Sequence, residues 1–241
     1  MIVILFTVAS AAANVLGAAA VVSRRKWSTT SLELLLGVAA GFMIAVALLD
    51  MLPAAYAGGG RTSAFVVLAG FVLVHLTQHV LAAHFHFGEE THPVSASVGA
   101  SALVGLCVHT LVDGVAIASG FAVSQSLGLL VFLAIFLHKF PEGLAIGSVF
   151  LASGASRARA LAAAATLGLF TVAGGLLAGA VPALGTQGLA LSAGVTLYVA
   201  GSNLVPELQK QRRGALAAAF LAGCLLYLLA STVAGELFPT P

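Results

Sequence analysis

Eight apolar segments follow one another along the chain, each near the roughly 20 residues that an α-helix needs to cross a membrane. Their approximate boundaries are 1–22, 31–55, 63–85, 97–122, 127–152, 160–181, 188–207 and 214–236. Only 7% of the residues are charged, whereas a soluble domain has about 25%. The sequence therefore predicts an all-α integral membrane protein, with eight transmembrane helices forming a single domain over residues 1–241.

The first segment, 1–22, ends in small residues and so resembles a secretory signal peptide. Its basic residues, Arg24, Arg25 and Lys26, follow the apolar run, whereas those of a signal peptide precede it. We therefore interpret this segment as the first transmembrane helix. The net charge is only +2, which indicates no nucleic-acid partner.

The basic residues between the spans predict the orientation of the chain. Eight of them follow spans 1, 5 and 7, namely Arg24, Arg25, Lys26, Arg157, Arg159, Lys210, Arg212 and Arg213. The opposite side receives only Arg61. Because basic loops stay in the cytoplasm, both termini are expected outside it, in a multi-pass protein of the cell membrane. The bacterial inner membrane is the location that we expect.

One pattern occurs twice, in residues 109–121 and 138–150, and places a His four residues before a carboxylate. His109 therefore shares a helix face with Asp113, and His138 shares one with Glu142. A buried carboxylate is costly unless it is paired or coordinates a metal. Two imidazoles and two carboxylates suit Zn²⁺, and Fe²⁺, Mn²⁺, Co²⁺ or Cd²⁺ accept similar donors. The alternative is that these pairs merely hold two helices together.

A second, outer pair of motifs flanks the first. Asp50 precedes Pro53 by three residues in span 2, and Asn203 precedes Pro206 by three residues in span 7. Both the inner and the outer pair lie on spans that cross in opposite directions, which indicates an inverted repeat with a site near mid-membrane. Chance similarity of apolar helices is the alternative for the outer pair. Pro141 lacks an N–H group and is expected to kink span 5 beside the inner site.

The paired inner motifs resemble those of the ZIP family of divalent-metal transporters, and the resemblance covers nearly the whole chain. It implies eight helices in a 3+2+3 inverted-repeat bundle, with the metal between spans 4 and 5. It also implies Zn²⁺ uptake into the cytoplasm by alternating access, in which a transport domain moves against a scaffold like an elevator. Carried over by position, the metal ligands are His109, Asp113, His138 and Glu142. Met43 matches a position that adds a thioether contact, although core packing explains it equally well.

The chain departs from the family pattern at the position after each motif His. Many members carry Asn or Asp there and hold a second metal, whereas this chain has Thr110 and Lys139. Span 6 also lacks an acid that could bridge two ions. Lys139 lies three residues before Glu142, within reach of its carboxylate. We therefore expect the Lys139 ammonium to replace the second cation and leave one transported ion. The alternative is that Lys139 extends toward water without touching the site.

Other polar residues suggest a path for the ion. Asp50 is expected to attract cations at the outer mouth. Asn203 stands where the resemblance puts a carboxylate or His, so that part of the path is weaker. His75 and His79 form either a relay toward the cytoplasm or a polar stripe facing the bundle. Glu207 is either an exit residue or an interfacial charge.

The segment after span 3 forms a His-containing cytoplasmic loop at about residues 86–96. Short His-rich tracts bind metals weakly, so a docking or sensing role is one interpretation of this region. A solvated loop without a metal is the other. The histidines concerned are His84, His86 and His92.

Two further classes of function use the same ligands. An intramembrane zinc metalloenzyme would use them to activate water, and a metal-sensing membrane scaffold would bind the ion without moving it. The chain has no HExxH motif and no evident separate general base, so we expect that it is not an enzyme. The expected partners are a divalent metal ion and the lipid bilayer. A homodimer is one assembly open to such a chain.

Overall fold

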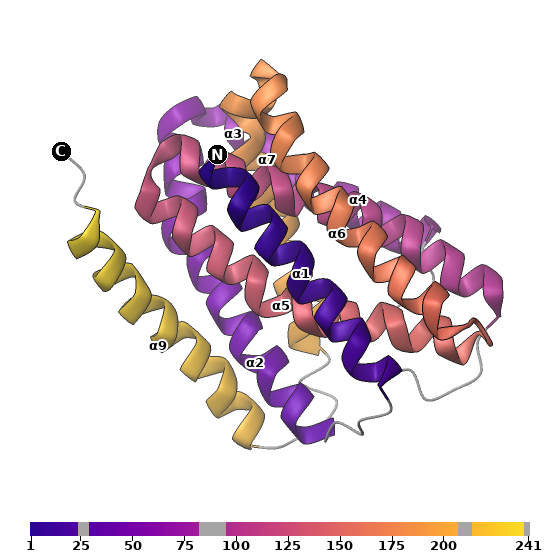
Figure 1. The fold of residues 1–241 in the computed structure, drawn as a ribbon. Helices are drawn as coiled ribbons and strands as arrows, with labels where there is room; N and C mark the ends of the chain where they lie inside the picture. The colour runs from indigo at the N-terminus through magenta and orange to yellow at the C-terminus, as the bar shows by residue number, and fades with distance from the viewer. Residues whose placement is uncertain (24–28, 82–94, 207–213, 239–241) are drawn as a thin grey trace.

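The computed structural model describes residues 1–23, 29–81, 95–206 and 214–238, and these residues are helical apart from short connections. The elements, with π-helical segments labelled η, are α1 (Ile2–Val22), α2 (Thr29–Val46), η1 (Ala47–Met51), α3 (Leu52–Leu76), η2 (Thr77–Leu81), α4 (Ala96–Val123), α5 (Gln125–Ala152), α6 (Arg157–Ala180), α7 (Pro182–Tyr198), η3 (Val199–Leu204) and α9 (Gly214–Leu237). Figure 1 shows them as one bundle. The predicted all-α membrane class is confirmed.

Six helical segments in the described ranges are long and apolar enough to cross a membrane. They are Ile2–Val22, Thr30–His79, Gly99–Val123, Gln125–Ala152, Arg157–Ala180 and Gly214–Leu237. The second of these, with 50 residues, contains a kink at Gly60, where φ is 54° and ψ is −137°. This left-handed conformation suits glycine because it has no Cβ. The kink divides the segment into residues 30–59 and 61–79, each long enough to cross a membrane.

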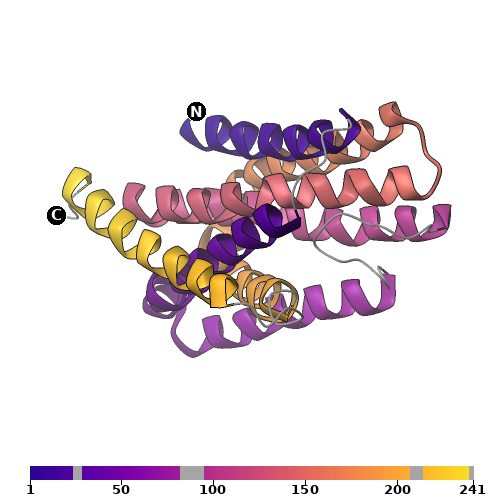
Figure 2. The ribbon, with the colours of Figure 1, turned by 90° about the horizontal axis from the view of Figure 1, so that it is seen from below.

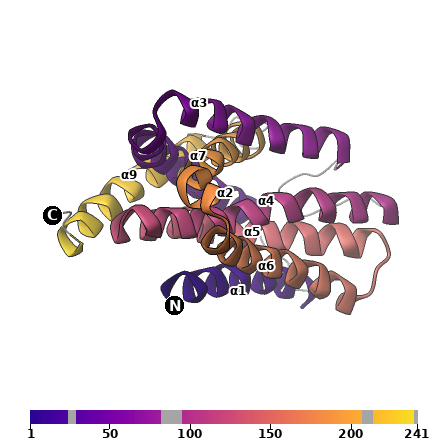
Figure 3. The same cartoon turned by 90° about the horizontal axis from the view of Figure 1, so that it is seen from above.

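The central helices α4 and α5 pack against each other and separate two sets of neighbours. On one side α1 packs on α5 and α6, and α6 packs on α4. On the other side α2 packs on α9, and α3 packs on α7. Figure 3 shows α1 and α3 on opposite sides, with α4 and α5 between them. Figure 2 shows that Met1 and the end of α9 lie at the same end of the bundle.

The closest helix contacts occur where a glycine meets a backbone carbonyl of a neighbouring helix, which leaves no room for a Cβ. These contacts come in two matching sets. The first set joins Gly143 to Asn14, Gly17 to Phe140, Gly114 to Thr171, and Gly174 to Leu111. The second set joins Gly41 to Phe220, Gly223 to Val38, Gly70 to Leu191, and Gly194 to Val67. Small residues of this kind let helix backbones approach closely where no hydrophobic force drives their association.

Each contact has a counterpart at a constant residue offset. Gly143 and Gly114 are 29 positions apart, like the two inner motifs, and their partners lie on α1 and α6. In the second set, the α2–α9 contacts have counterparts between α7 and α3. The packing therefore pairs α1 with α6, α2 with α7, α3 with α9, and α4 with α5.

The outer pair of motifs shares a backbone distortion. Asp50 lies in η1, which ends two residues before Pro53. Asn203 lies in η3, which ends two residues before Pro206. Proline cannot donate a backbone hydrogen bond to the carbonyl four residues earlier, and π-helical turns are a usual response to such an interruption. Both copies of the outer motif thus adopt the same local structure.

Two helix boundaries differ from the sequence-based expectation. A loop was expected between spans 2 and 3, at residues 56–62, but α3 (Leu52–Leu76) runs through this stretch and is interrupted by the kink at Gly60. The helix expected to begin at residue 188 begins at Pro182. A proline is favoured in the first helical turn because its missing N–H has no partner there in any helix.

Candidate metal site

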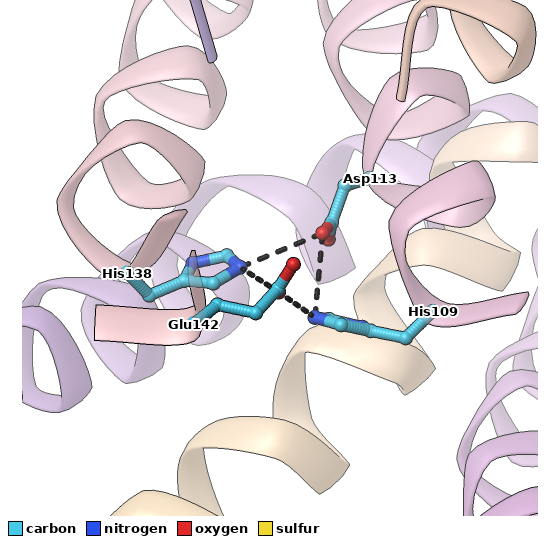
Figure 4. A group of neighbouring side chains, drawn as sticks. All are labelled: His109, Asp113, His138 and Glu142. Carbon is cyan, nitrogen blue, oxygen red and sulfur yellow. Dashed lines mark ion pairs between the residues drawn. The ribbon is translucent and has the colours of Figure 1, made fainter. Parts of the chain in front are cut away.

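Four side chains from α4 and α5 point at one another near the middle of the bundle (Figure 4). His109 and Asp113 come from α4, and His138 and Glu142 come from α5. Each residue offers one ligand atom, and these four atoms all lie within 4.8 Å of one another. All four side chains are buried. The i, i+4 spacing in each helix therefore forms one cluster, which we call the four-residue cluster.

The His nitrogens of the cluster face the carboxylates of both helices. His109 Nε2 lies 3.3 Å from Asp113 Oδ2 and 3.3 Å from Glu142 Oε2. His138 Nε2 lies 3.5 Å from Asp113 Oδ2 and 4.0 Å from Glu142 Oε2. Each imidazole thus contacts one carboxylate on its own helix and one across the helix interface. This arrangement offers two nitrogen and two oxygen donors to a single point.

The two imidazoles are held differently. His138 Nδ1 lies 3.0 Å from the carbonyl oxygen of Ala134, which can only accept, so we assign the proton to Nδ1. The Nε2 lone pair of His138 then faces the cluster, as metal ligation requires. Neither ring nitrogen of His109 makes a hydrogen bond of good geometry within the described part of the chain. Its Nε2 is therefore a buried polar atom aimed at two carboxylates, a position that suits a metal ligand.

Lys139 is fully buried and joins both carboxylates of the cluster. Its Nζ lies 2.7 Å from Asp113 Oδ2 and 3.0 Å from each carboxylate oxygen of Glu142. With both carboxylates ionised, the ammonium charged and the imidazoles neutral, the group carries one net negative charge. Sequence spacing predicted the contact with Glu142, whereas the contact with Asp113 depends on how α4 packs on α5.

Asn14, on α1, is a site residue that the sequence reasoning missed. Its Nδ2 donates to Glu142 Oε1 at 2.9 Å, and its side chain is fully buried. The sequence does carry a signal for Asn14, namely a polar amide inside an otherwise apolar span. Polar residues within a membrane span are candidates for a functional role. Its partner, however, lies on a helix far away in the sequence.

Three other residues were predicted to belong to the site or to shape it, namely Thr110, Met43 and Pro141. The buried Thr110 hydroxyl donates to the Cys107 carbonyl of its own helix at 3.2 Å. Met43 is buried in the larger apolar core with neighbours such as Val46, and its thioether contact with a metal stays a prediction. α5 remains helical through Pro141, and the kink expected there also stays a prediction.

Asp50 accepts a hydrogen bond from the last helix, α9. The Tyr227 hydroxyl of α9 donates to Asp50 Oδ2 at 2.6 Å. Asp50 is partly exposed, as is Asn203 in the matching π-helix η3. The roles of both residues in the ion path stay predictions.

His75 and His79 form a small aromatic cluster with Tyr198 of α7. Their rings stack with centroids 4.2 Å apart, and Tyr198 Oη lies 3.3 Å from His75 Nδ1. His79 Nδ1 lies 2.9 Å from the His75 carbonyl oxygen, so this nitrogen carries the proton and Nε2 is left with a lone pair. Both rings are exposed rather than turned into the core.

Four of the predicted residues lie outside the described residues. They are Glu207 and the loop histidines His84, His86 and His92.

The fold and the cluster define the class of the protein: a multi-pass membrane protein with buried side chains suited to a divalent metal ion. The family model of the ZIP zinc transporters matches residues 88–231, which is more than half of the chain. The chain belongs to this family, and membership implies transport of divalent metal ions. A comparison with curated proteins found no match.

Proposed function

We propose that this protein carries Zn²⁺ into the cytoplasm and that the ion binds at the four-residue cluster between α4 and α5. The observation that carries the proposal is the approach of four ligand atoms within 4.8 Å of one another on the two central helices. Two imidazole nitrogens and two carboxylate oxygens form a donor set that zinc accepts in tetrahedral geometry. Fe²⁺, Mn²⁺, Co²⁺ and Cd²⁺ share enough of this chemistry to be alternative substrates.

The site takes one ion at a time, because Lys139 occupies the place of a second cation. Its Nζ lies between Asp113 Oδ2 and Glu142 Oε2, at 2.7 and 3.0 Å. The span that would supply a further acid has Thr171 facing Gly114 at the corresponding depth. A fixed ammonium next to the ligands would repel a second divalent ion.

Transport proceeds by alternating access, with the helices that hold the site moving as a unit. The eight spans form a 3+2+3 inverted repeat, an arrangement supported by the matching glycine contacts and the two π-helices before proline. α1, α4, α5 and α6 surround the cluster and are tied together by glycine-to-carbonyl contacts. The pairs α2–α9 and α3–α7 share contacts of the same kind, and these helices form the scaffold.

The orientation follows from the charges of the connecting segments. Arg157 and Arg159 begin α6, at the opposite end of α5 from Ser124. Placing these basic residues in the cytoplasm puts Met1 and the end of α9 on the outer side, in a cell membrane. Asp50 then lies toward the outer mouth, and His75 and His79 lie toward the cytoplasm.

The two other classes of function have less support from the geometry. A catalytic zinc site keeps an open position for water, whereas this cluster has four protein donors around one point. A sensing scaffold would bind zinc without flux. Zinc flux into proteoliposomes, with peptide and lipid hydrolysis measured on the same preparation, separates the three classes.

The direct test replaces a ligand and measures uptake. His138→Ala and Glu142→Ala are expected to abolish zinc uptake by proteoliposomes, because each removes a donor from the point where the ion binds. Ser148→Ala is the matched control: this residue is buried on the same helix, and its hydroxyl donates to the Ala145 carbonyl of that helix. Wild-type uptake in either ligand variant would refute the site.

A further inference from the structure

Among the described residues, α1 makes one hydrogen bond to the cluster, and it comes from the Asn14 amide. Nδ2 donates to Glu142 Oε1, and the opposite amide orientation would place Oδ1 against a carboxylate oxygen. Asn14 Oδ1 itself is buried without a hydrogen-bond partner in the described part of the chain. The bond to Glu142 is therefore the polar contact that orients this side chain.

The α1 backbone is fixed on both sides of this contact. A Cβ on Gly143 would meet the Asn14 carbonyl, and a Cβ on Gly17 would meet the Phe140 carbonyl. Since Phe140 and Gly143 flank Glu142 along α5, α1 cannot slide without losing one of these contacts. The Asn14 amide is thus held at a set position beside the carboxylate.

The two oxygens of Glu142 consequently differ. Oε1 accepts from Asn14 at 2.9 Å and from Lys139 at 3.0 Å, which uses both of its lone pairs. Oε2 also accepts from Lys139 at 3.0 Å, but it receives no bond from Asn14 and faces the cluster, 3.3 Å from His109 Nε2. An ion at the centre of the cluster therefore meets one oxygen of Glu142, and the second oxygen is turned away.

The related position on the other half of the repeat has no such contact. Thr171 on α6 packs against Gly114 as Asn14 packs against Gly143. Its hydroxyl donates to the Leu167 carbonyl of its own helix at 3.3 Å. Among the described residues, Asp113 therefore receives no hydrogen bond from α6 to match the one that Glu142 receives from Asn14 on α1, although Lys139 of α5 contacts both carboxylates. The two halves of the repeat hold their carboxylates differently.

The geometry points to Asn14 as a positioning residue that limits Glu142 to one metal-binding oxygen and so favours Zn²⁺ over Mn²⁺. Four donors suit tetrahedral Zn²⁺, whereas Mn²⁺ prefers more oxygen ligands. Loss of the Asn14 hydrogen bond leaves Glu142 Oε1 held by Lys139 alone, which contacts both carboxylate oxygens at 3.0 Å and does not favour one of them. The carboxylate can then turn so that Oε1 binds the ion as well. This inference rests on the proposed metal site and adds what sets its selectivity.

The test compares Asn14→Leu with Thr171→Val, two nearly isosteric replacements at related positions. Zn²⁺ and Mn²⁺ uptake are measured in competition, and X-ray absorption at the zinc edge counts the ligands of the bound ion. Groups that orient ligands typically contribute ~10–100-fold to metal affinity. We expect Asn14→Leu to weaken zinc affinity by about tenfold, to weaken Mn²⁺ affinity less, and to raise the coordination number of bound zinc. Thr171→Val should retain the wild-type selectivity and coordination number.

Asn14→Thr guards against misfolding of the leucine variant, because a threonine hydroxyl can bond its own helix as Thr171 does. It should reproduce the change in selectivity. Unchanged coordination and an unchanged Mn²⁺-to-Zn²⁺ ratio in both Asn14 variants would overturn the role of Asn14 while leaving the metal site intact. Wild-type protein that binds no zinc at the cluster would instead overturn the proposed function.

Discussion

Lys139 on α5 and Asp113 on α4 form a buried ion pair, with Nζ 2.7 Å from Oδ2. The pair crosses the interface between the two helices that supply the proposed metal ligands. It engages the same Asp113 oxygen that His109 and His138 face, at 3.3 and 3.5 Å. At the proposed site, the ammonium and a transported ion would therefore compete for one carboxylate oxygen, and the ion would displace part of this contact on binding.

The number of ions bound per chain follows from this competition. Purified wild-type protein is expected to bind one zinc ion at the cluster, because Lys139 retains at least one carboxylate contact beside it. Zinc titration with metal analysis after removal of excess ion measures the ratio. Glu142→Ala, which removes a ligand, is the control and should lose this ion. Two ions per chain at the cluster would contradict the replacement of a second cation by Lys139.

Lys139 is also expected to matter when the carrier is empty. Once the ion has left, the ammonium still compensates the two buried carboxylates, whereas in Lys139→Gln they face each other without a charged partner. Breaking a buried ion pair costs roughly 3–5 kcal/mol, and about 1.4 kcal/mol corresponds to a factor of ten. The variant should therefore lose net zinc uptake by at least about tenfold, while exchange of labelled for unlabelled zinc continues, because the loaded carrier keeps its four ligands.

Lys139→Arg keeps the positive charge and is the matched variant for this comparison. For each variant, net zinc uptake is divided by the rate of zinc exchange of the same variant. This ratio should be higher in Lys139→Arg than in Lys139→Gln. An equal loss of net uptake and exchange in Lys139→Gln would show that the lysine acts on ion binding alone.

The glycine contacts predict opposite effects for two substitutions in α6. Gly174→Ala places a Cβ against the Leu111 backbone of α4, which cannot move aside like a flexible side chain. Overpacking of this kind costs roughly 1–3 kcal/mol, so the variant should unfold at a lower temperature in detergent. Gly179 is exposed on the same helix, and its added Cβ meets nothing within 4 Å. Gly179→Ala should be neutral or slightly stabilising, since alanine favours a helix by about 1 kcal/mol over glycine. Equal destabilisation by both would contradict the packing.

The sequence predicted the grouping of the four residues of the cluster more fully than it predicted their surroundings, for a physical reason. His109 with Asp113, and His138 with Glu142, share a helix face through local spacing alone, and their chemistry requires a common partner. The Lys139 contact with Asp113 depends on the depth at which α4 and α5 cross. The Asn14 contact depends on a third helix, which local periodicity does not place.

The ends of the helices were also harder to predict from the sequence where they depend on contacts with other helices. A loop was expected between spans 2 and 3, at residues 56–62, but of the three consecutive glycines at 58–60 only Gly60 adopts a positive φ. Gly59 remains in the helix, where an added Cβ would meet the Ser63 and Gln187 side chains. Contact with α7 therefore restrains Gly59, and no pattern within the segment distinguishes the three glycines.

Asp50 is expected to raise the local concentration of cations at the outer mouth. Asp50→Asn removes this charge and should raise the KM for zinc severalfold with little change in kcat, because the central site is unchanged. Tyr227→Phe removes the 2.6 Å hydrogen bond to Asp50 but keeps the charge, so its KM should stay near or below the wild-type value. Glu236→Gln is the control for loss of an exposed negative charge near the end of α9. Equal effects of Asp50→Asn and Glu236→Gln would argue against a specific role for Asp50.

The proposed orientation can be tested at the two ends of α5. Gln125 begins this helix, and Ala158 lies in the first turn of α6 beyond its other end; both are exposed. If the basic residues at the start of α6 face the cytoplasm, a membrane-impermeant thiol reagent should label Gln125→Cys in intact cells. Ala158→Cys should react only after the cells are permeabilised. The two native cysteines, Cys107 and Cys224, are replaced by alanine in both variants, and the cysteine-free parent should remain unlabelled under either condition. Labelling of Ala158→Cys but not Gln125→Cys in intact cells would reverse the orientation and place Asp50 on the cytoplasmic side, whereas the four-residue cluster would stay at the same depth in the membrane.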